Sequence, residues 1–176
     1  MASGVVNSAI LSVQQARLDA HESIAVEIDT IKSNIVSTHA AARQEVYSLR
    51  TEILSLKKDQ IDNKDNASVV AQDQAAIKAD QALIKQVPGQ EKEAVRREQA
   101  EIRALNGLDH DSSRNASATI KQLLRGRLDP IDVPSLIDTT NTNVQVKIGR
   151  ISNVAEGYYQ GALGFFSNNL QGRASS

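Results

Sequence analysis

Apolar residues recur at helical spacing along the first third of the chain. Between residues 24 and 56 the intervals are three, four or seven positions, at Ile24, Ile28, Ile31, Ile35, Ala42, Val46, Leu49, Ile53 and Leu56. This spacing places them on one face of an α-helix. One row keeps a seven-residue interval while its neighbour drifts, which favours bundle packing or a short coiled coil. We therefore expect a helix from about residue 5 to about residue 62.

A polar segment at residues 62–66 predicts a turn, and Asn66 is a suitable N-cap for a second helix. An internal repeat follows, because residues 73–79 and 80–86 are related in sequence and carry apolar residues seven positions apart. The two helices are expected to form a long hairpin.

Several residues predict interruptions after the repeat. Pro88 and Gly89 are expected to break or kink the second helix, since proline lacks a backbone donor, and Gly107 is expected to end it. Residues 109–113 then predict a loop, which is followed by a short helix that stops at Gly126.

Two prolines divide the chain near residue 130. Residues 127–135 predict a linker, which separates residues 1–126, the hairpin and short helix, from residues 136–176, a C-terminal interaction helix capped by Ser135. Apolar residues of this helix alternate at intervals of four and three, a heptad pattern typical of a helix–helix interface. The predicted interface consists of Val144, Ile148, Ile151, Ala155, Tyr158, Ala162 and Phe165.

The aromatic residues gather near the C-terminus. Tyr47 alone lies outside residues 158–166, and Glu156 is the only charged residue between positions 151 and 172. We expect this segment to contact something other than water. A second row could contact a membrane in an alternative function, and it comprises Tyr159, Leu163, Phe166 and Leu170.

Glycines accompany these aromatic residues. Gly157, Gly161 and Gly164 lower helix stability and would be explained by close packing against another helix. The other interpretation is that both apolar rows pack against the preceding helices and the glycines face outward.

Composition and charge narrow the function classes. With 20 basic and 21 acidic residues the net charge is −1, so the whole chain has no field that would attract nucleic acid. Cysteine is absent, which excludes disulfides and thiolate chemistry. No signal peptide or membrane-spanning run is apparent, so the chain is expected to be made as a soluble protein.

Catalytic and metal-binding patterns are not found. The three histidines lie far apart and match no zinc or di-iron motif, and the aspartates near residue 62 lack the glycine and glutamate of a calcium loop. We expect no cofactor, no metal and no small-molecule substrate. Arg114, Lys121 and Arg125 form a local basic strip that could touch phosphate, although a solvated helix face explains them better.

The sequence therefore predicts an all-α, elongated helical hairpin or bundle with coiled-coil character and a long C-terminal heptad helix. The expected function is a non-enzymatic structural or assembly protein that forms a homo-oligomer or packs with other helical proteins. Its composition suits a multi-copy component of a virus particle or of a secretion or appendage assembly. The alternative is a membrane-active protein that inserts its C-terminal helix into a bilayer.

Overall fold

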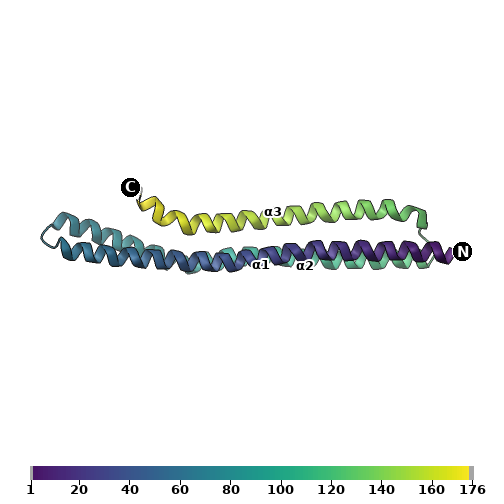
Figure 1. Ribbon diagram of the computed structural model, residues 1–176, viewed down its shortest axis with the longest axis horizontal. Helices are drawn as coiled ribbons and strands as arrows, with labels where there is room; N and C mark the ends of the chain where they lie inside the picture. Colours follow the sequence, from purple (N-terminus) through teal and green to yellow (C-terminus); the bar gives the residue numbers. More distant parts are fainter. Residues whose placement is uncertain (1, 175–176) are drawn as a thin grey trace. The chain divides into compact units, whose positions relative to one another are not determined.

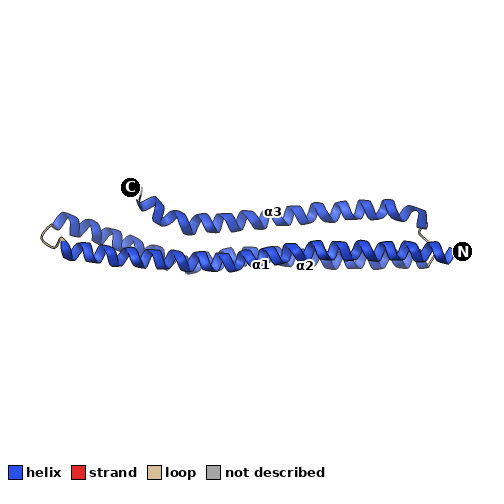
Figure 2. Cartoon of the chain, in the orientation of Figure 1, coloured by secondary structure: helices blue, strands red, loops and turns tan. Residues whose placement is uncertain are grey.

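The structure, a computed structural model, describes residues 2–174 and, among the side chains, those of residues 3–167. Within this part the chain forms three α-helices, one short 3-10 helix and no strand (Figures 1 and 2). In chain order the elements are α1 (Ala2–Asp62), α2 (Ala67–Leu124), η1 (Pro130–Asp132) and α3 (Val133–Ala174). The predicted all-α helical bundle class is confirmed.

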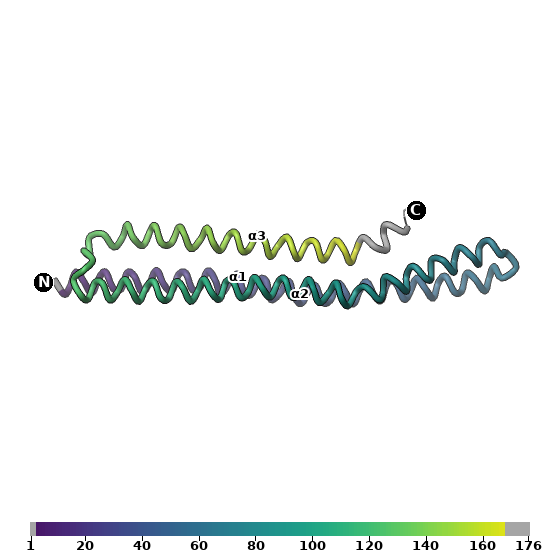
Figure 3. The backbone as a smooth tube through the Cα atoms, turned by 180° about the vertical axis from the view of Figure 1, so that it is seen from behind, coloured from purple at the N-terminus to yellow at the C-terminus, as the bar shows by residue number. Residues whose placement is uncertain are grey.

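The turn between α1 and α2 lies where the polar segment predicted it, and Figure 3 follows the backbone through it. The side chain of Asn66 accepts a hydrogen bond of 3.3 Å from the backbone N–H of Val69, as an N-cap does. At the end of α1, Asn63 donates its backbone N–H to the carbonyl of Asp59 at 2.9 Å. The predicted turn and cap are both confirmed.

α2 ends in a glycine-based cap. Gly126 has φ +69°, and its N–H donates to the carbonyl of Leu123 at 3.2 Å. The N–H of Arg127 donates to the carbonyl of Gln122 at 2.9 Å, which completes a Schellman motif. The prediction that the helix stops at Gly126 is confirmed.

The predicted interruptions before this point are wrong in part. α2 continues through Pro88 and Gly89 without a break and does not end at Gly107. Pro88 removes one hydrogen bond of the helix. The helix persists because Val87 beside it is buried in a core cluster with Ala42, and tertiary packing outweighs local propensity.

Residues 109–113, predicted as a loop, are also helical. Asp109, the first residue of the predicted loop, forms an ion pair of 2.8 Å with Arg17 and a contact of 3.0 Å with His21, both on α1. Burial of Leu105 and Leu108 on one face continues the helical periodicity toward Leu123. Residues typical of loops can therefore lie within a helix and make polar contacts with a neighbouring helix.

α3 begins before the position that the sequence suggested. It starts at Val133, so Ser135 lies inside its first turn and is not the N-cap. Pro134 is tolerated there because the first N–H groups of a helix have no acceptor within it. Asp129 caps the preceding η1, accepting a hydrogen bond of 3.1 Å from the N–H of Ile131. The prediction of a linker at residues 127–135 stays a prediction.

The chain packs as two compact units, and all three helices contribute to each. Unit 1 comprises Met1–Lys32 and Gln99–Glu156, and unit 2 comprises Ser33–Glu98 and Gly157–Ser176. A core cluster of unit 1 contains the buried residues Ala9, Val13, Leu123 and Val133. A core cluster of unit 2 contains the buried residues Ala42, Val87, Ala162 and Phe166.

Candidate association surface

The predicted C-terminal interface lies mostly inside the folded chain. Four of its residues are buried, with exposed fractions of at most 9%, and these are Val144, Ile148, Ala155 and Ala162. The others, Ile151, Tyr158 and Phe165, are half-buried. In unit 1, Val144 lines a small cavity of about 40 Å³ together with Val13 and Ala116. Contact of this row with another chain stays a prediction, but packing within the chain already covers most of it.

The second C-terminal row is similarly occupied. Tyr159 and Leu163 are half-buried and Phe166 is buried, whereas the Leu170 side chain lies outside the described residues. The Phe165 and Phe166 rings meet edge to face with centroids 5.5 Å apart. In the same unit, the Arg97 guanidinium lies 5.5 Å from the centre of the Tyr158 ring, a cation–π contact. Tyr158, Phe165 and Phe166 therefore have aromatic or cation–π contacts within their own chain.

Gly157 and Gly161 make no close contact with another helix of the described chain. A Cβ atom placed on Gly157 or Gly161 would meet no atom within 4 Å, and the same holds for Gly149. Gly164 is half-buried. Their close packing against another chain stays a prediction.

The basic strip remains a solvated feature of unit 1. Arg114, Lys121 and Arg125 are all exposed near the end of α2, and so is His110. Among the described residues, no group of three or more His, Cys, Asp or Glu side chains could hold a metal ion. In the same part of the chain, no helix has a stretch sufficiently long and apolar to cross a membrane.

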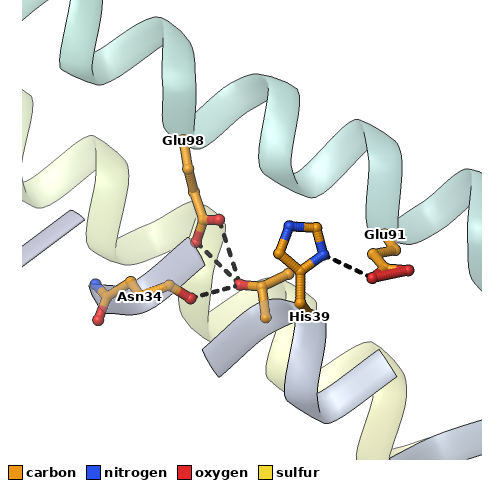
Figure 4. A network of polar contacts seen from close by, with 5 residues as sticks. Asn34, His39, Glu91 and Glu98 are labelled. Carbon is orange, nitrogen blue, oxygen red and sulfur yellow. Dashed lines mark hydrogen bonds and ion pairs between the residues drawn. The ribbon is translucent and has the colours of Figure 1, made fainter. Parts of the chain in front are cut away.

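Unit 2 contains a polar network between α1 and α2 that sequence reasoning did not predict (Figure 4). The Thr38 hydroxyl lies 3.2 Å from Oε1 of Glu98 and 2.9 Å from the carbonyl oxygen of Asn34, so its proton serves either acceptor. His39 Nδ1 lies 2.7 Å from Oε1 of Glu91. Burial raises the pKa of Glu98, although the Thr38 hydrogen bond and the nearby His39 oppose the rise.

Other carboxylates of α1 in unit 2 also turn toward the interior. Glu45 is buried and Asp59 is half-buried, as is Glu52 between them. Burial raises the pKa of Glu45. A hydrogen bond to Asp59 raises the pKa of Asp73 on α2, with partial burial adding to the effect. The sequence does carry a signal for this inward face, because Glu45, Glu52 and Asp59 lie seven residues apart, as apolar core residues of a packed helix do.

Large apolar side chains face solvent along α1. Their exposed fractions lie between 55% and 71%. We call those of unit 1 the unit 1 stripe, which consists of Val5, Leu11, Leu18 and Val26. We call those of unit 2 the unit 2 stripe, which consists of Val36, Tyr47, Leu54 and Ile61. The pattern in residues 24–56 identified only the inner face of this helix, because polar residues dilute the outer one.

The stripes have the spacing of helix-packing positions. Leu11 and Leu18 are seven residues apart in unit 1, and Tyr47, Leu54 and Ile61 are seven apart in unit 2. Residues at this interval lie nearly above one another on a helix. Leu11 and Leu18 in unit 1 therefore form a narrow apolar line that a second helix can cover, as do the three residues of unit 2. Val5 and Val26 lie on other sides of α1.

Comparison with known proteins assigns no function to this surface. No protein-family model matches the chain, and no curated protein or solved structure is detectably similar to it.

Proposed function

We propose that the chain is a non-enzymatic assembly protein that associates through α1 with copies of itself or with other helices. The observation that carries the proposal is the seven-residue spacing of exposed apolar side chains on α1, above all Tyr47, Leu54 and Ile61. A multi-copy assembly is the setting in which such a surface would be covered.

Association is favoured energetically because it removes these apolar side chains from water. Burying a leucine or isoleucine side chain that is otherwise exposed contributes about 1.5–3 kcal/mol. Single exposed apolar residues are ordinary on a protein surface, whereas apolar residues repeated at the heptad interval are the pattern of helix–helix contacts. A net charge of only −1 adds little repulsion between copies.

The alternative surface at the C-terminus is less available. Ala155, Ala162 and Phe166 are already buried within their own units. An association that used them would first have to separate α3 from packed neighbours, whereas α1 presents its stripes without rearrangement.

Light scattering across a range of protein concentrations tests the proposal. We expect the molar mass to rise with concentration, and Leu54→Asp to lower it while circular dichroism shows the helical content retained. Ser55→Asp is the matched control, because Ser55 is exposed beside the stripe and the substitution introduces the same charge. A monomeric mass at every concentration would overturn the proposal.

A further inference from the structure

The polar residues between the stripe positions of α1 have opposite charge in the two units. In unit 1, Glu22 and Asp29 are exposed in line with Leu18. In unit 2, Arg43 and Arg50 are exposed in line with Leu54. Each unit therefore presents an apolar line interrupted by charges of one sign.

Both segments follow the same alternation of three-residue and four-residue steps. In unit 1 the outward positions are residues 11, 15, 18, 22, 25 and 29, and in unit 2 they are residues 43, 47, 50, 54, 57 and 61. This alternation is the pattern by which one helix packs against another in a coiled coil. All twelve positions are exposed except Ala25, which is half-buried.

We propose that a second copy of this chain docks antiparallel on α1, with residues 11–29 of one copy against residues 43–61 of the other. The inference rests on the proposed function and adds the partner, the orientation and the register. Each copy supplies one acidic and one basic segment, so either segment finds a complementary one on the second copy.

One register satisfies the whole pattern. If Arg43 faces Asp29 of the second copy, the antiparallel steps bring every remaining outward position opposite another outward position. The further pairs are Arg50 with Glu22, Leu54 with Leu18, Ile61 with Leu11, Tyr47 with Ala25 and Lys57 with Gln15.

Charge separates this arrangement from its competitors. A parallel pair in register would set Arg50 against Arg50 and Glu22 against Glu22, and like charges in contact are unfavourable. An anionic membrane would attract the basic segment but repel the acidic one. The second copy is the occupant whose charges complement both segments.

The two kinds of layer have different roles in this contact. Leu54 with Leu18 and Ile61 with Leu11 remove apolar surface from water and supply affinity. The charged layers contribute less net free energy, since ions lose hydration on burial, but they fix orientation and register.

A charge exchange tests the register. We expect Arg50→Glu or Glu22→Arg alone to weaken the dimer at least about tenfold in sedimentation equilibrium, because each places like charges together. The double variant E22R/R50E restores opposite charges and should return the dissociation constant to within about threefold of the parent value. Arg114→Glu is the control, since it makes the same charge change at an exposed position of α2.

Crosslinking supplies a readout that does not depend on charge. The chain has no cysteine, so the double variant Gln15→Cys/Lys57→Cys introduces one thiol in each segment, at exposed positions that face one another in this register. Under mild oxidation we expect a disulfide-linked dimer from this variant. We expect little from Thr30→Cys/Lys57→Cys, in which the first thiol lies at an exposed position on another side of α1.

The outcomes separate the inference from the proposed function. A parent protein that is monomeric throughout would overturn both. A parent protein that associates, but whose association is unchanged by the single charge reversals and whose Gln15→Cys/Lys57→Cys variant does not crosslink, would overturn the antiparallel register alone.

Discussion

The interiors of the two units differ, although the same three helices build both. Buried polar or charged residues are found among the described residues only in unit 2, and they are Thr38, Glu45, Asp80 and Glu98. The buried residues of unit 1 are apolar, and its main polar contact lies nearer the surface. The same type of helix packing thus tolerates two very different interiors.

Because the two units surround their carboxyl groups differently, we expect the two units to respond differently to pH. Burial raises the pKa of Asp109 in unit 1, but hydrogen bonds from His21 and Arg17 outweigh it, so the pKa lies below its usual value. In unit 2, burial dominates at Glu98 and the pKa lies above its usual value. Falling pH is therefore expected to weaken the Asp109 contact and to relieve the cost of burying Glu98.

The largest effect is expected from a cavity in the apolar interior of unit 1. Leu123→Ala removes a side chain that is 2% exposed and packed in the core cluster, so the free energy of unfolding should fall by about 3 kcal/mol. Denaturant unfolding measures the change. Leu124→Ala is the matched control, because the adjacent side chain is 66% exposed and its loss should cost less than about 0.5 kcal/mol.

Equal losses for the two variants would contradict the placement of Leu123 in the core. A change in the denaturant slope would instead report a loss of cooperativity, which the midpoint alone would not reveal.

A smaller effect of opposite sign is expected in unit 2. Glu98→Gln keeps an acceptor for the Thr38 hydroxyl but removes a buried charge, so it should stabilise the protein at pH 7. Because the folded pKa is raised, the parent carboxyl takes up its proton before the unfolded chain does as the pH falls. The penalty is present at neutral pH and is gone below the unfolded value of 4.5.

The measurement is therefore the difference between two pH values. Unfolding of the parent and of Glu98→Gln should diverge at pH 7 and converge near pH 4. A stabilisation that is equal at both pH values would show that removal of the charge is not its cause.

Local residues account for the elements that the sequence predicted correctly. Asn66 and Gly126 act through their own side-chain and backbone chemistry, so the turn and the end of α2 could be placed before any packing was known. Pro88 and Asp109 also have strong local preferences, but packing of Val87 and the contact with Arg17 override them. Such contacts join residues far apart in sequence and leave no local signal.

The candidate surface was missed for a related reason. Apolar periodicity in residues 24–56 is strongest on the face of α1 that the other helices cover, whereas the stripe with Tyr47 and Leu54 carries one apolar residue in each heptad. For the C-terminal heptad row the sequence left two interpretations open, because periodicity does not show whether its own chain or another one buries it. Periodicity identifies the apolar faces of a helix, but only the packed structure shows which of these faces stays exposed to solvent.

The smallest effect is expected at the turn of unit 2, which contrasts with the glycine-based turn of unit 1. Asn66→Ala removes the acceptor for the Val69 N–H and should cost about 0.5 kcal/mol, a low value because the turn is exposed and water can replace the lost bond. Asn66→Asp keeps a capping oxygen and should be nearly neutral. Hydrogen exchange of the first amides of α2 is the sensitive measurement, since it reports local opening that global unfolding averages out. Faster exchange in both variants would assign the stability of this turn to the asparagine amide and not to its role as an acceptor.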